Sequence, residues 1–529
     1  MNWYDNAIIY HIYPLGFCGA PKYNDGSEDV IYRLDKVLEW IPHLKEMNVD
    51  AVYFGPVFQS VEHGYDTIDY KKIDSRLGDN NSFRYICDRL HESGIRVILD
   101  GVFNHVGRKF PQFVDVQKNG QSSQYCDWFQ NLNFGGPSPC GDPFWYEGWN
   151  GHYNLVKLNL RNVGVCDHLI DAVNYWIESF GIDGIRFDSA DCIDFDFFKR
   201  IRDFCKGKKR DFWLMGEIIH GDYNRWANPE MLDSVTNYEC YKGLWSAHNY
   251  KNYFEIDYSI NRQSGANGGI YRNISLYNFV DNHDVNRLAS TLHNNAHLPL
   301  VYTLMYTMPG IPSIYYGSEF GVEGRKENNS DDNLRPCLHL NDLLAHGNVS
   351  LYKHIVKLGR IYRAYPALRT GSYERLVITN QQILFKKTLG EQTVYVALNL
   401  GDREYDLDFT THLSGLVDVF TAAPIPVENG KVHIRMTPYA AMIIVADDIV
   451  NNEPESKEVV ADKETEIVVG AKYRHFKGNE YEIISVARHS ETMEELVVYK
   501  SLKNGEVWAR PKSMFIGRAG DVRRFTKLD

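Results

Sequence analysis

Short apolar runs alternate with longer segments of helical periodicity over the first 370 residues of the chain. The runs at 49–54 and 95–100 are each followed by Gly and have the length of buried strands. The segment 82–93 places apolar residues three and four positions apart, as an amphipathic helix does. Counting a weak strand near 234–237, the region holds eight such strand–helix units. The pattern predicts an α/β fold, a (β/α)8 TIM barrel over residues 1–370.

The rest of the chain departs from this repeat. Residues 106–161 lack the periodicity and are rich in Gly, Asn and aromatic residues, which predicts a subdomain inserted after the third strand. Short alternating runs predict an antiparallel β-sandwich over 371–447. Residues 448–466 are acidic and poor in aromatic residues, as a linker would be. Residues 467–529 predict a small β-rich domain.

Charge and cysteine content narrow the class of protein. The chain has 529 residues and a net charge of −12, which argues against nucleic acid and anionic membranes as main partners. No apolar run approaches roughly 18 residues, and the start of the chain lacks the basic and apolar regions of a signal peptide. Nine scattered cysteines without metal-type spacing predict free thiols in a reducing cytoplasm, although a secreted protein trimmed of its signal would look the same. The oligomeric state stays open.

Four acidic residues lie at or just beyond the carboxyl ends of predicted strands: Asp100, Asp188, Glu217 and Asp284. On a barrel these ends converge on one face, which holds the active site. Arg186 precedes Asp188 by two positions, so both side chains point the same way along a strand. A buried arginine keeps a neighbouring carboxylate ionised, as a nucleophile requires. One such acid could merely cap a helix, but four with distinctive neighbours predict an enzyme site.

These residues lie in motifs that resemble those of the α-amylase family of retaining α-glucoside hydrolases, glycoside hydrolase family 13. Six segments match in order, within about the first 445 residues. They are 63–70 (HGYDTIDY), 100–105 (DGVFNH), 184–188 (GIRFD), 216–218 (GEI), 279–284 (FVDNHD) and 310–319 (GIPSIYYGSE). The family carries a small domain in one wall of its cleft and a β-sandwich after its barrel. The resemblance therefore implies the same architecture for this chain.

The resemblance implies roles for three of the carboxylates. Asp188 would be the nucleophile, and Glu217 the acid that protonates the glycosidic oxygen and then the base that activates water. Asp284 would stabilise the transition state. In retaining enzymes the paired carboxyl groups lie roughly 5 Å apart. Glu217 needs a raised pKa and Asp188 an ionised carboxylate, and only Asp188 has an arginine beside it in sequence.

The resemblance also implies residues that hold the sugar. Tyr65 would stack under the ring whose bond is cut, and His105 and His283 would donate hydrogen bonds to hydroxyl groups. Arg186 would orient Asp188.

Two further residues, Asp66 and Arg335, lie in loops that follow neighbouring parts of the barrel. We expect them to form an ion pair that grips the 4- and 6-hydroxyls of a terminal glucose and blocks a longer chain. The alternatives are a turn aspartate and an exposed arginine. The pair would restrict the enzyme to short substrates cut from an end.

Two segments refine the resemblance. Residues 157–159 (KLN) match part of a signature of the neopullulanase, cyclomaltodextrinase and maltogenic amylase branch. Residues 189–192 (SADC) stand where many α-amylases carry a Lys-His pair, so the leaving-group side of the cleft differs from that of a long-chain endo-amylase. A family calcium site takes a backbone oxygen from this region. With only Asn104 as a candidate ligand, a structural calcium ion is not supported, and no metal or other cofactor is expected for the chemistry.

The tail resembles a family of short bacterial proteins of unassigned function. Its residues Tyr473, His475, Tyr499 and Trp508 suit either a glycan- or partner-binding face or a domain core. We favour the core, because so small a domain needs aromatic side chains to fill its interior.

For the whole chain we expect a hydrolase of α-1,4-linked maltooligosaccharides, cyclodextrins or starch-type glucans, with some α-1,6 or transfer activity. The alternative is a 4-α-glucanotransferase, in which a sugar rather than water resolves the intermediate. A non-enzymatic relative, such as the barrel subunit of an amino-acid transporter, would have lost the carboxylates and would need a membrane anchor. The sequence contradicts both conditions.

Overall fold

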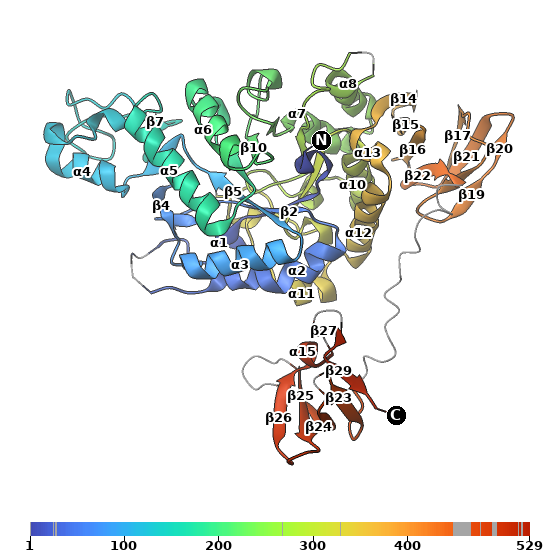
Figure 1. Ribbon diagram of the computed structural model, residues 1–529. Helices are drawn as coiled ribbons and strands as arrows, with labels where there is room; N and C mark the ends of the chain where they lie inside the picture. Colours follow the sequence, from blue (N-terminus) through green and yellow to red (C-terminus); the bar gives the residue numbers. More distant parts are fainter. Residues whose placement is uncertain are drawn as a thin grey trace. The chain divides into compact units, whose positions relative to one another are not determined.

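The computed structural model describes most of the chain (Figure 1). The described residues are 2–528 except 25, 27–28, 267, 328–329, 448–466, 477, 489–494, 517 and 520–521. The chain divides into two compact units, Met1–Asn451 and Asn452–Asp529. The predicted acidic linker, 448–466, lies outside the described residues.

Eight parallel strands form the centre of the first unit, in the order β11-β10-β9-β5-β2-β1-β13-β12. They are β1 (Ile9–Ile12), β2 (Ala51–Phe54), β5 (Arg96–Gly101), β9 (Gly184–Phe187), β10 (Trp213–Gly216), β11 (Ser234–Val235), β12 (Tyr277–Asn278) and β13 (Ile311–Tyr315). A parallel bridge between Thr236 and Tyr277 joins the two ends of this order. The predicted α/β fold and TIM barrel are confirmed.

Helices surround the strands (Figure 1). The turns at their ends set the direction in which the next strand enters the barrel. The main helices are α2 (Lys36–Glu46), α3 (Asn80–Glu92), α5 (Val163–Phe180), α6 (Phe195–Lys208), α7 (Tyr238–Asn249), α8 (Tyr253–Ser264), α10 (Leu298–Thr307) and α12 (Val349–Ala364). Asn162 caps the start of α5, and Gly181 ends it with a φ of +68°. Glycine adopts this left-handed conformation without strain, so the chain turns there into β9. The turn sets the direction of the strand that carries Arg186.

The segment inserted after β5 has its own sheet and core. Strands β6 (His105–Gly107), β7 (Gly148–Trp149) and β8 (His152–Lys157) pair antiparallel beside helix α4 (Pro111–Asn119). Phe113, Phe129, Phe144 and Tyr146 are buried. By contrast Trp128, Phe134, Trp145 and Trp149 are only half-buried.

Two antiparallel sheets follow the barrel. One has the order β14-β15-β16-β22-β18-β19 and the other β17-β21-β20. Their strands are β14 (Ser372–Ile378), β15 (Gln382–Leu389), β16 (Gln392–Asn399), β17 (Tyr405–Thr410), β18 (Leu416–Asp418), β19 (Ala423–Ile425), β20 (Val427–Glu428), β21 (Lys431–Met436) and β22 (Ala440–Ala446). Leu384 and Ile444 of the first sheet share one apolar core with Leu407 and Ile434 of the second, which makes a sandwich.

The second unit is a five-stranded antiparallel sheet with the order β26-β25-β24-β23-β29. Its strands are β23 (Lys472–His475), β24 (Glu480–Arg488), β25 (Glu495–Ser501), β26 (Val507–Pro511) and β29 (Phe525–Lys527), with the short helix α15 (Lys512–Ile516). Tyr473 and Tyr499 lie in its apolar core with Phe515 and Phe525. Trp508, in contrast, is 54% exposed on the edge strand β26. Thus two of the four side chains in question serve the core and Trp508 does not.

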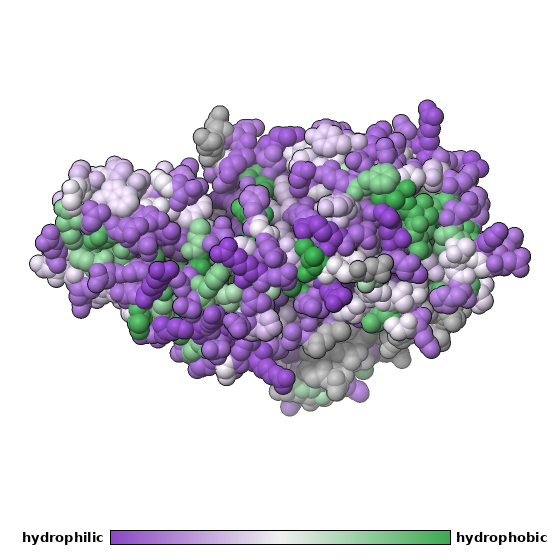
Figure 2. All heavy atoms as spheres, turned by 90° about the horizontal axis from the view of Figure 1, so that it is seen from above, coloured by the Kyte–Doolittle hydropathy of each residue, from purple (hydrophilic) through white to green (hydrophobic). Residues whose placement is uncertain are grey.

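The surface is largely hydrophilic, with hydrophobic residues in small separate patches on the face that Figure 2 shows. No described helix is both long and apolar enough to cross a membrane.

Candidate active site

Arg186 is the centre of the cluster at the carboxyl ends of the strands. Its Nη1 lies 2.9 Å from Oδ1 of Asp100 and 2.9 Å from Oδ1 of Asp188, and its Nη2 lies 2.9 Å from Oε2 of Glu217. All four side chains are buried. One cation thus holds three carboxylates. The sequence had placed only Asp188 beside this arginine. The predicted nucleophile and acid are brought together around one guanidinium.

Glu217 is the carboxyl group suited to carry a proton. Burial raises its pKa to about 7, and the neighbouring charges of Asp188 and Asp284 act in the same direction against the opposing effect of Arg186. A carboxyl group with a pKa near neutrality can donate a proton and take it back within one reaction.

The turn after β9 fixes Glu217 beside Asp188. Ser189 has a left-handed φ of +44°, and its backbone N–H donates to Oε2 of Glu217 at 3.1 Å. The N–H of Ala190 donates to the Glu217 carbonyl at 3.2 Å. Tyr238, at the start of α7, donates from its hydroxyl to Oε1 of Glu217 at 3.4 Å. Sequence reasoning missed Ser189 and Tyr238 as contacts of the acid, because no local pattern marks them.

The carboxylate of Asp100 is held by hydrogen bonds from side chains around it. Tyr53 donates a hydrogen bond to its Oδ2 at 2.8 Å, and Tyr65 does so at 3.3 Å. With Arg186 on its other oxygen, Asp100 is fully engaged and orients the arginine rather than facing the cleft.

Asp284 is held by charged and polar groups from two loops. Arg335 donates from Nη2 to Oδ1 of Asp284 at 2.9 Å, and from Nε to the His283 carbonyl at 3.0 Å. Nε2 of His283 lies 3.1 Å from Oδ2 of Asp284. Burial alone would raise the pKa of Asp284, but His283, Arg335 and Arg186 lower it below the usual range. Asp284 is therefore ionised, and at 37% exposure its side chain is open to the cleft.

Tyr65 forms a flat platform together with His283. The two rings stack at 5.5 Å with an interplanar angle of 11°, and the Tyr65 hydroxyl is in short contact with His283 Nε2. The Tyr13 ring is also nearly parallel to His283, with centroids 5.9 Å apart.

The predicted ion pair between Asp66 and Arg335 is wrong. Asp66 accepts backbone hydrogen bonds within its own loop, from Val61 at 3.0 Å and Glu62 at 2.9 Å. Arg335 instead pairs with Asp284 and, at 3.0 Å, with Asp331. The carboxylate of Asp66 is 6% exposed and satisfies the loop amides next to Tyr65, so it fixes that loop instead of reaching across the barrel.

His105 is a neutral hydrogen-bonding group at the other side of the site. Burial lowers its pKa to about 4. Its Nδ1 lies 3.1 Å from the Asn104 side chain, whereas its Nε2 is buried without a partner among the described residues. Trp149 of the inserted segment lies 5.5 Å away, ring to ring. A buried ring nitrogen with no protein partner is suited to a ligand hydroxyl.

No three or more His, Cys, Asp or Glu side chains of the described residues converge as metal ligands. Asn104, the single candidate noted in the sequence, has its side chain against His105.

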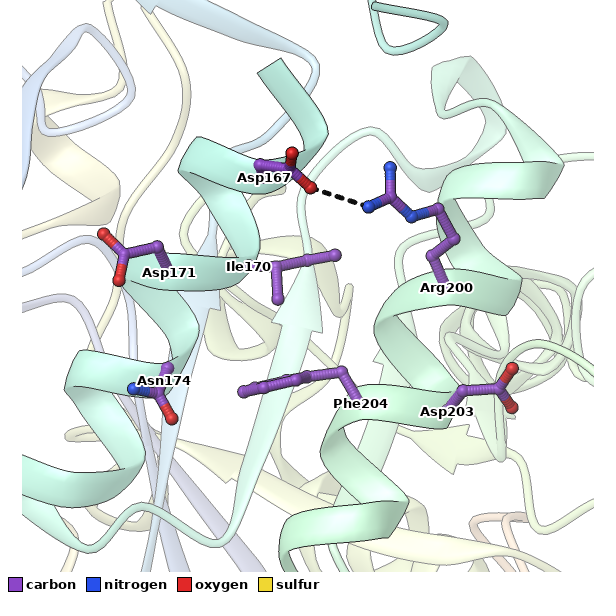
Figure 3. Close-up of a pocket in the computed structure, with 7 residues that line it drawn as sticks. All are labelled: Asp167, Ile170, Asp171, Asn174, Arg200, Asp203 and Phe204. Carbon is purple, nitrogen blue, oxygen red and sulfur yellow. Dashed lines mark hydrogen bonds and ion pairs between the residues drawn. The ribbon is translucent and has the colours of Figure 1, made fainter. Parts of the chain in front are cut away.

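The helical layer carries a separate hollow of about 490 Å³ between α5 and α6. Figure 3 shows Ile170 and Phe204 facing each other there, with Asp167 and Arg200 joined across the gap at 2.7 Å. None of the strand-end carboxylates lines it, so it is distinct from the barrel site.

Comparison with known proteins agrees with this geometry. Residues 12–343 match the alpha amylase catalytic domain, and residues 471–527 match a protein family of unknown function, DUF1653. A cyclomaltodextrinase from Bacillus sp is 32% identical over 428 residues, covering 75% of this chain and 73% of the relative. Neopullulanase 2 of Thermoactinomyces vulgaris is 31% identical over 473 residues, covering 84% and 78%.

Among solved structures, a cyclomaltodextrinase superposes with a TM-score of 0.76 at 27% identity, covering 84% of this chain and 78% of its own. Since the catalytic-domain match spans more than half of the chain and includes every residue of the Arg186 cluster, the protein belongs to the α-amylase family.

Proposed function

We propose that the protein is a retaining hydrolase of α-1,4-glucosidic bonds in maltooligosaccharides, cyclodextrins and starch-type glucans, with α-1,6 cleavage and transfer as side activities. The observation that carries this proposal is the placement of Asp188 and Glu217 on one guanidinium while the pKa of Glu217 is about 7. A carboxyl group placed to attack and a second one with a raised pKa, side by side, are the two groups that double displacement needs. The names of the relatives support the substrate class.

The first half of the reaction forms an ester. Asp188 attacks the anomeric carbon as the bond to the leaving oxygen breaks, and Glu217 gives its proton to that oxygen. Arg186 holds Asp188 in position, because its Nη1 donates to both Asp188 and the engaged Asp100. In the second half Glu217 takes a proton from water, the water oxygen attacks the same carbon, and Asp188 leaves.

Asp284 and its partners would hold the reacting sugar. The ionised Asp284 accepts hydrogen bonds from two hydroxyls, and those bonds strengthen as positive charge develops on the ring. His105 offers its unpartnered Nε2 and His283 lies beside Asp284. The Tyr65 ring gives the apolar face of the pyranose a flat surface, and Asp66 holds the Tyr65 loop in place.

The cysteines bear on where the protein is located. All nine cysteines are free thiols in the structure. This supports a cytoplasmic location for the enzyme.

A single set of digests tests the proposed function. Maltotriose, a cyclodextrin, pullulan and soluble starch are incubated with the full chain and with Asp188→Asn, and the products are separated by chromatography. We expect glucose and maltose from maltotriose, linear products from cyclodextrin, and nothing from the variant. Products longer than maltotriose as the main outcome would identify a 4-α-glucanotransferase instead. No turnover of any of the four would refute the proposal.

A further inference from the structure

Helix α8 carries two large aromatic side chains on its solvent side. Phe254 is 46% exposed and Tyr258 is 68% exposed. Because they are four residues apart, they lie on one face and roughly 6 Å apart along the axis. Tyr250, which is 68% exposed, ends α7 just before this helix. We call these three side chains the α8 aromatic patch.

Phe254 and Tyr258 lie on the exposed face of α8, whereas the Tyr250 ring also meets the ring of His293 at 6.4 Å. The opposite face of α8 is buried and is fixed to β14, where Asp257 pairs with Arg375 at 2.7 Å and accepts from the Tyr373 hydroxyl at 3.1 Å. Figure 1 shows α8 at the top of the barrel near β14. Large aromatic side chains grouped on a surface, rather than scattered singly, mark a binding site.

Four of the charged side chains beside the patch form two ion pairs. Lys242 pairs with Glu255 at 2.7 Å, and Arg262 pairs with Glu239. With the exposed Lys251 next to Tyr250, the patch offers ring faces and tyrosine hydroxyls beside a single positive charge. This favours an uncharged, hydroxyl-rich ligand over nucleic acid or a charged peptide.

The size of the patch argues against a second protein molecule. An aromatic side chain buries about 150–250 Å² when covered, so three partly exposed ones supply roughly 350 Å². A stable protein interface needs about 800 Å² from each partner. A narrow chain that lies across two or three rings needs no more than the patch provides.

The patch is also remote from the reacting bond. Tyr238 at the first position of α7 contacts Glu217, and α7 is 12 residues long. Its far end, where Tyr250 lies, is roughly 17 Å from that contact at 1.5 Å per residue.

We propose that the α8 aromatic patch binds an α-glucan chain at a second site, outside the catalytic cleft. The inference rests on the proposed function for its ligand class, since the same chain would then be cut at Asp188. Stacking of pyranose rings on Phe254 and Tyr258 would keep a long polymer on the enzyme between cuts. Short oligosaccharides cannot span the catalytic cleft and the patch together, so the patch would not increase their binding.

Affinity electrophoresis through gels that contain soluble amylose tests this. The full chain carries Glu217→Gln so that it does not digest the gel, and excess maltotriose occupies the cleft. The test variant adds Phe254→Ala and Tyr258→Ala. The matched control adds Tyr85→Ala, which removes a tyrosine that is 55% exposed on α3. A third variant, Tyr258→Phe, keeps the ring.

We expect the double variant to lose about fivefold or more in amylose affinity, because both ring faces on the helix that a pyranose could stack on are removed. The Tyr85→Ala control and Tyr258→Phe should migrate as the parent does. Equal retardation of the parent and the double variant would overturn the inference, as would a parent that amylose does not retard. A dimer in sedimentation that the double variant dissociates would also overturn it, because the patch would then be a subunit interface.

Kinetics on the active enzyme separate this inference from the proposed function. With Glu217 intact, Phe254→Ala/Tyr258→Ala should raise KM for starch and leave kcat/KM for maltotriose within about twofold, as expected for residues that do not contact the reacting sugar. Failure of the parent to cleave maltotriose would count against the proposed function alone, and the gel result would stand by itself. Loss of maltotriose turnover in the double variant would contradict a second site.

Discussion

Arg335 holds Asp284 from a different loop, with its Nη2 2.9 Å from the Asp284 Oδ1. Its guanidinium also lies 4.5 Å from the ring of Tyr13, which follows the first strand. One arginine after β13 therefore connects the ends of β1 and β12. This contact keeps Asp284 ionised and oriented before a sugar arrives.

Removing this arginine should reduce the stabilisation of the transition state more than the stability of the fold. A charge-assisted hydrogen bond contributes about 1.5–3 kcal/mol, so Arg335→Ala should lower kcat/KM for maltotriose by roughly 10–100-fold. The pKa of Asp284 should rise in the variant, so the acid limb of the pH profile should move to higher pH. Asp331→Asn is the control, because Asp331 contacts Arg335 but not Asp284 in the ion pairs of the described residues. Equal profiles for Arg335→Ala and the parent would exclude this role.

Gly16 makes room for Arg335. A Cβ added at Gly16 would overlap the carbonyl oxygen of Arg335, so the two backbones can approach only without a side chain there. Gly16→Ala should displace Arg335 and reproduce the kinetic loss of Arg335→Ala in the same direction. Gly207→Ala in α6, where a Cβ meets nothing within 4 Å, should leave kinetics unchanged and add a few tenths of a kcal/mol of stability or more. Normal kinetics in a folded Gly16→Ala protein would contradict the account.

The pH dependence should report the proton on Glu217. Since this acid must be protonated and its pKa is about 7, kcat/KM should fall as the pH rises through about 7. Tyr238→Phe removes a hydrogen bond that favours the charged carboxylate, so the basic limb should move up by roughly half a pH unit. Tyr241→Phe on the same helix is the matched control. A basic limb that stays in place in Tyr238→Phe would show that another group titrates there.

A buried lysine in the sandwich should limit stability at neutral pH. Lys387 on β15 is 0% exposed, its Nζ has no partner among the described residues, and burial lowers its pKa to about 7. Because the pKa is depressed on folding, the unfolded chain binds the extra proton between about pH 7 and about 10.5, and stability should rise with pH across that window.

Replacing this lysine removes the cost of an unpaired buried amine. Lys387→Met should raise the free energy of unfolding at pH 7 by about 2 kcal/mol or more, seen as a higher thermal midpoint. The midpoint should also depend less on pH. Lys386→Met serves as the control, since Lys386 is half-exposed and pairs with Glu374 at 3.0 Å. A Lys387→Met protein that melts below the parent would mean that the amine has a stabilising role.

The barrel and its site carboxylates were predictable because each depends on local pattern. Apolar runs mark the strands, and the position of Asp188 or Glu217 at a strand end follows from counting along the chain. The parallel strands then bring those ends together whatever the loops do. Asp188 and Arg186 point the same way by the strand period of two, and their side chains do meet, at 2.9 Å.

The contacts between loops were not predictable in the same way. Asp66 accepts hydrogen bonds from two amides of its own turn. These local bonds take the place of an ion pair with the distant Arg335. The reach of Arg186 to Glu217, and of Tyr238 to the same carboxylate, depends on side-chain directions that no periodicity fixes. The exposure of Trp508 likewise follows from its place on an edge strand, which the order of strands in the chain does not give.

The anomeric form of the first product tests the central claim most directly. Asp188 as nucleophile and Glu217 as acid and base require two inversions at one carbon, so the new reducing end must keep the α-configuration. Proton NMR in the first minutes of maltotriose cleavage, before mutarotation, should show the α-anomer ahead of the β-anomer. A β-anomer formed first would contradict the account, because a single displacement by water would leave no role for Asp188 as the nucleophile.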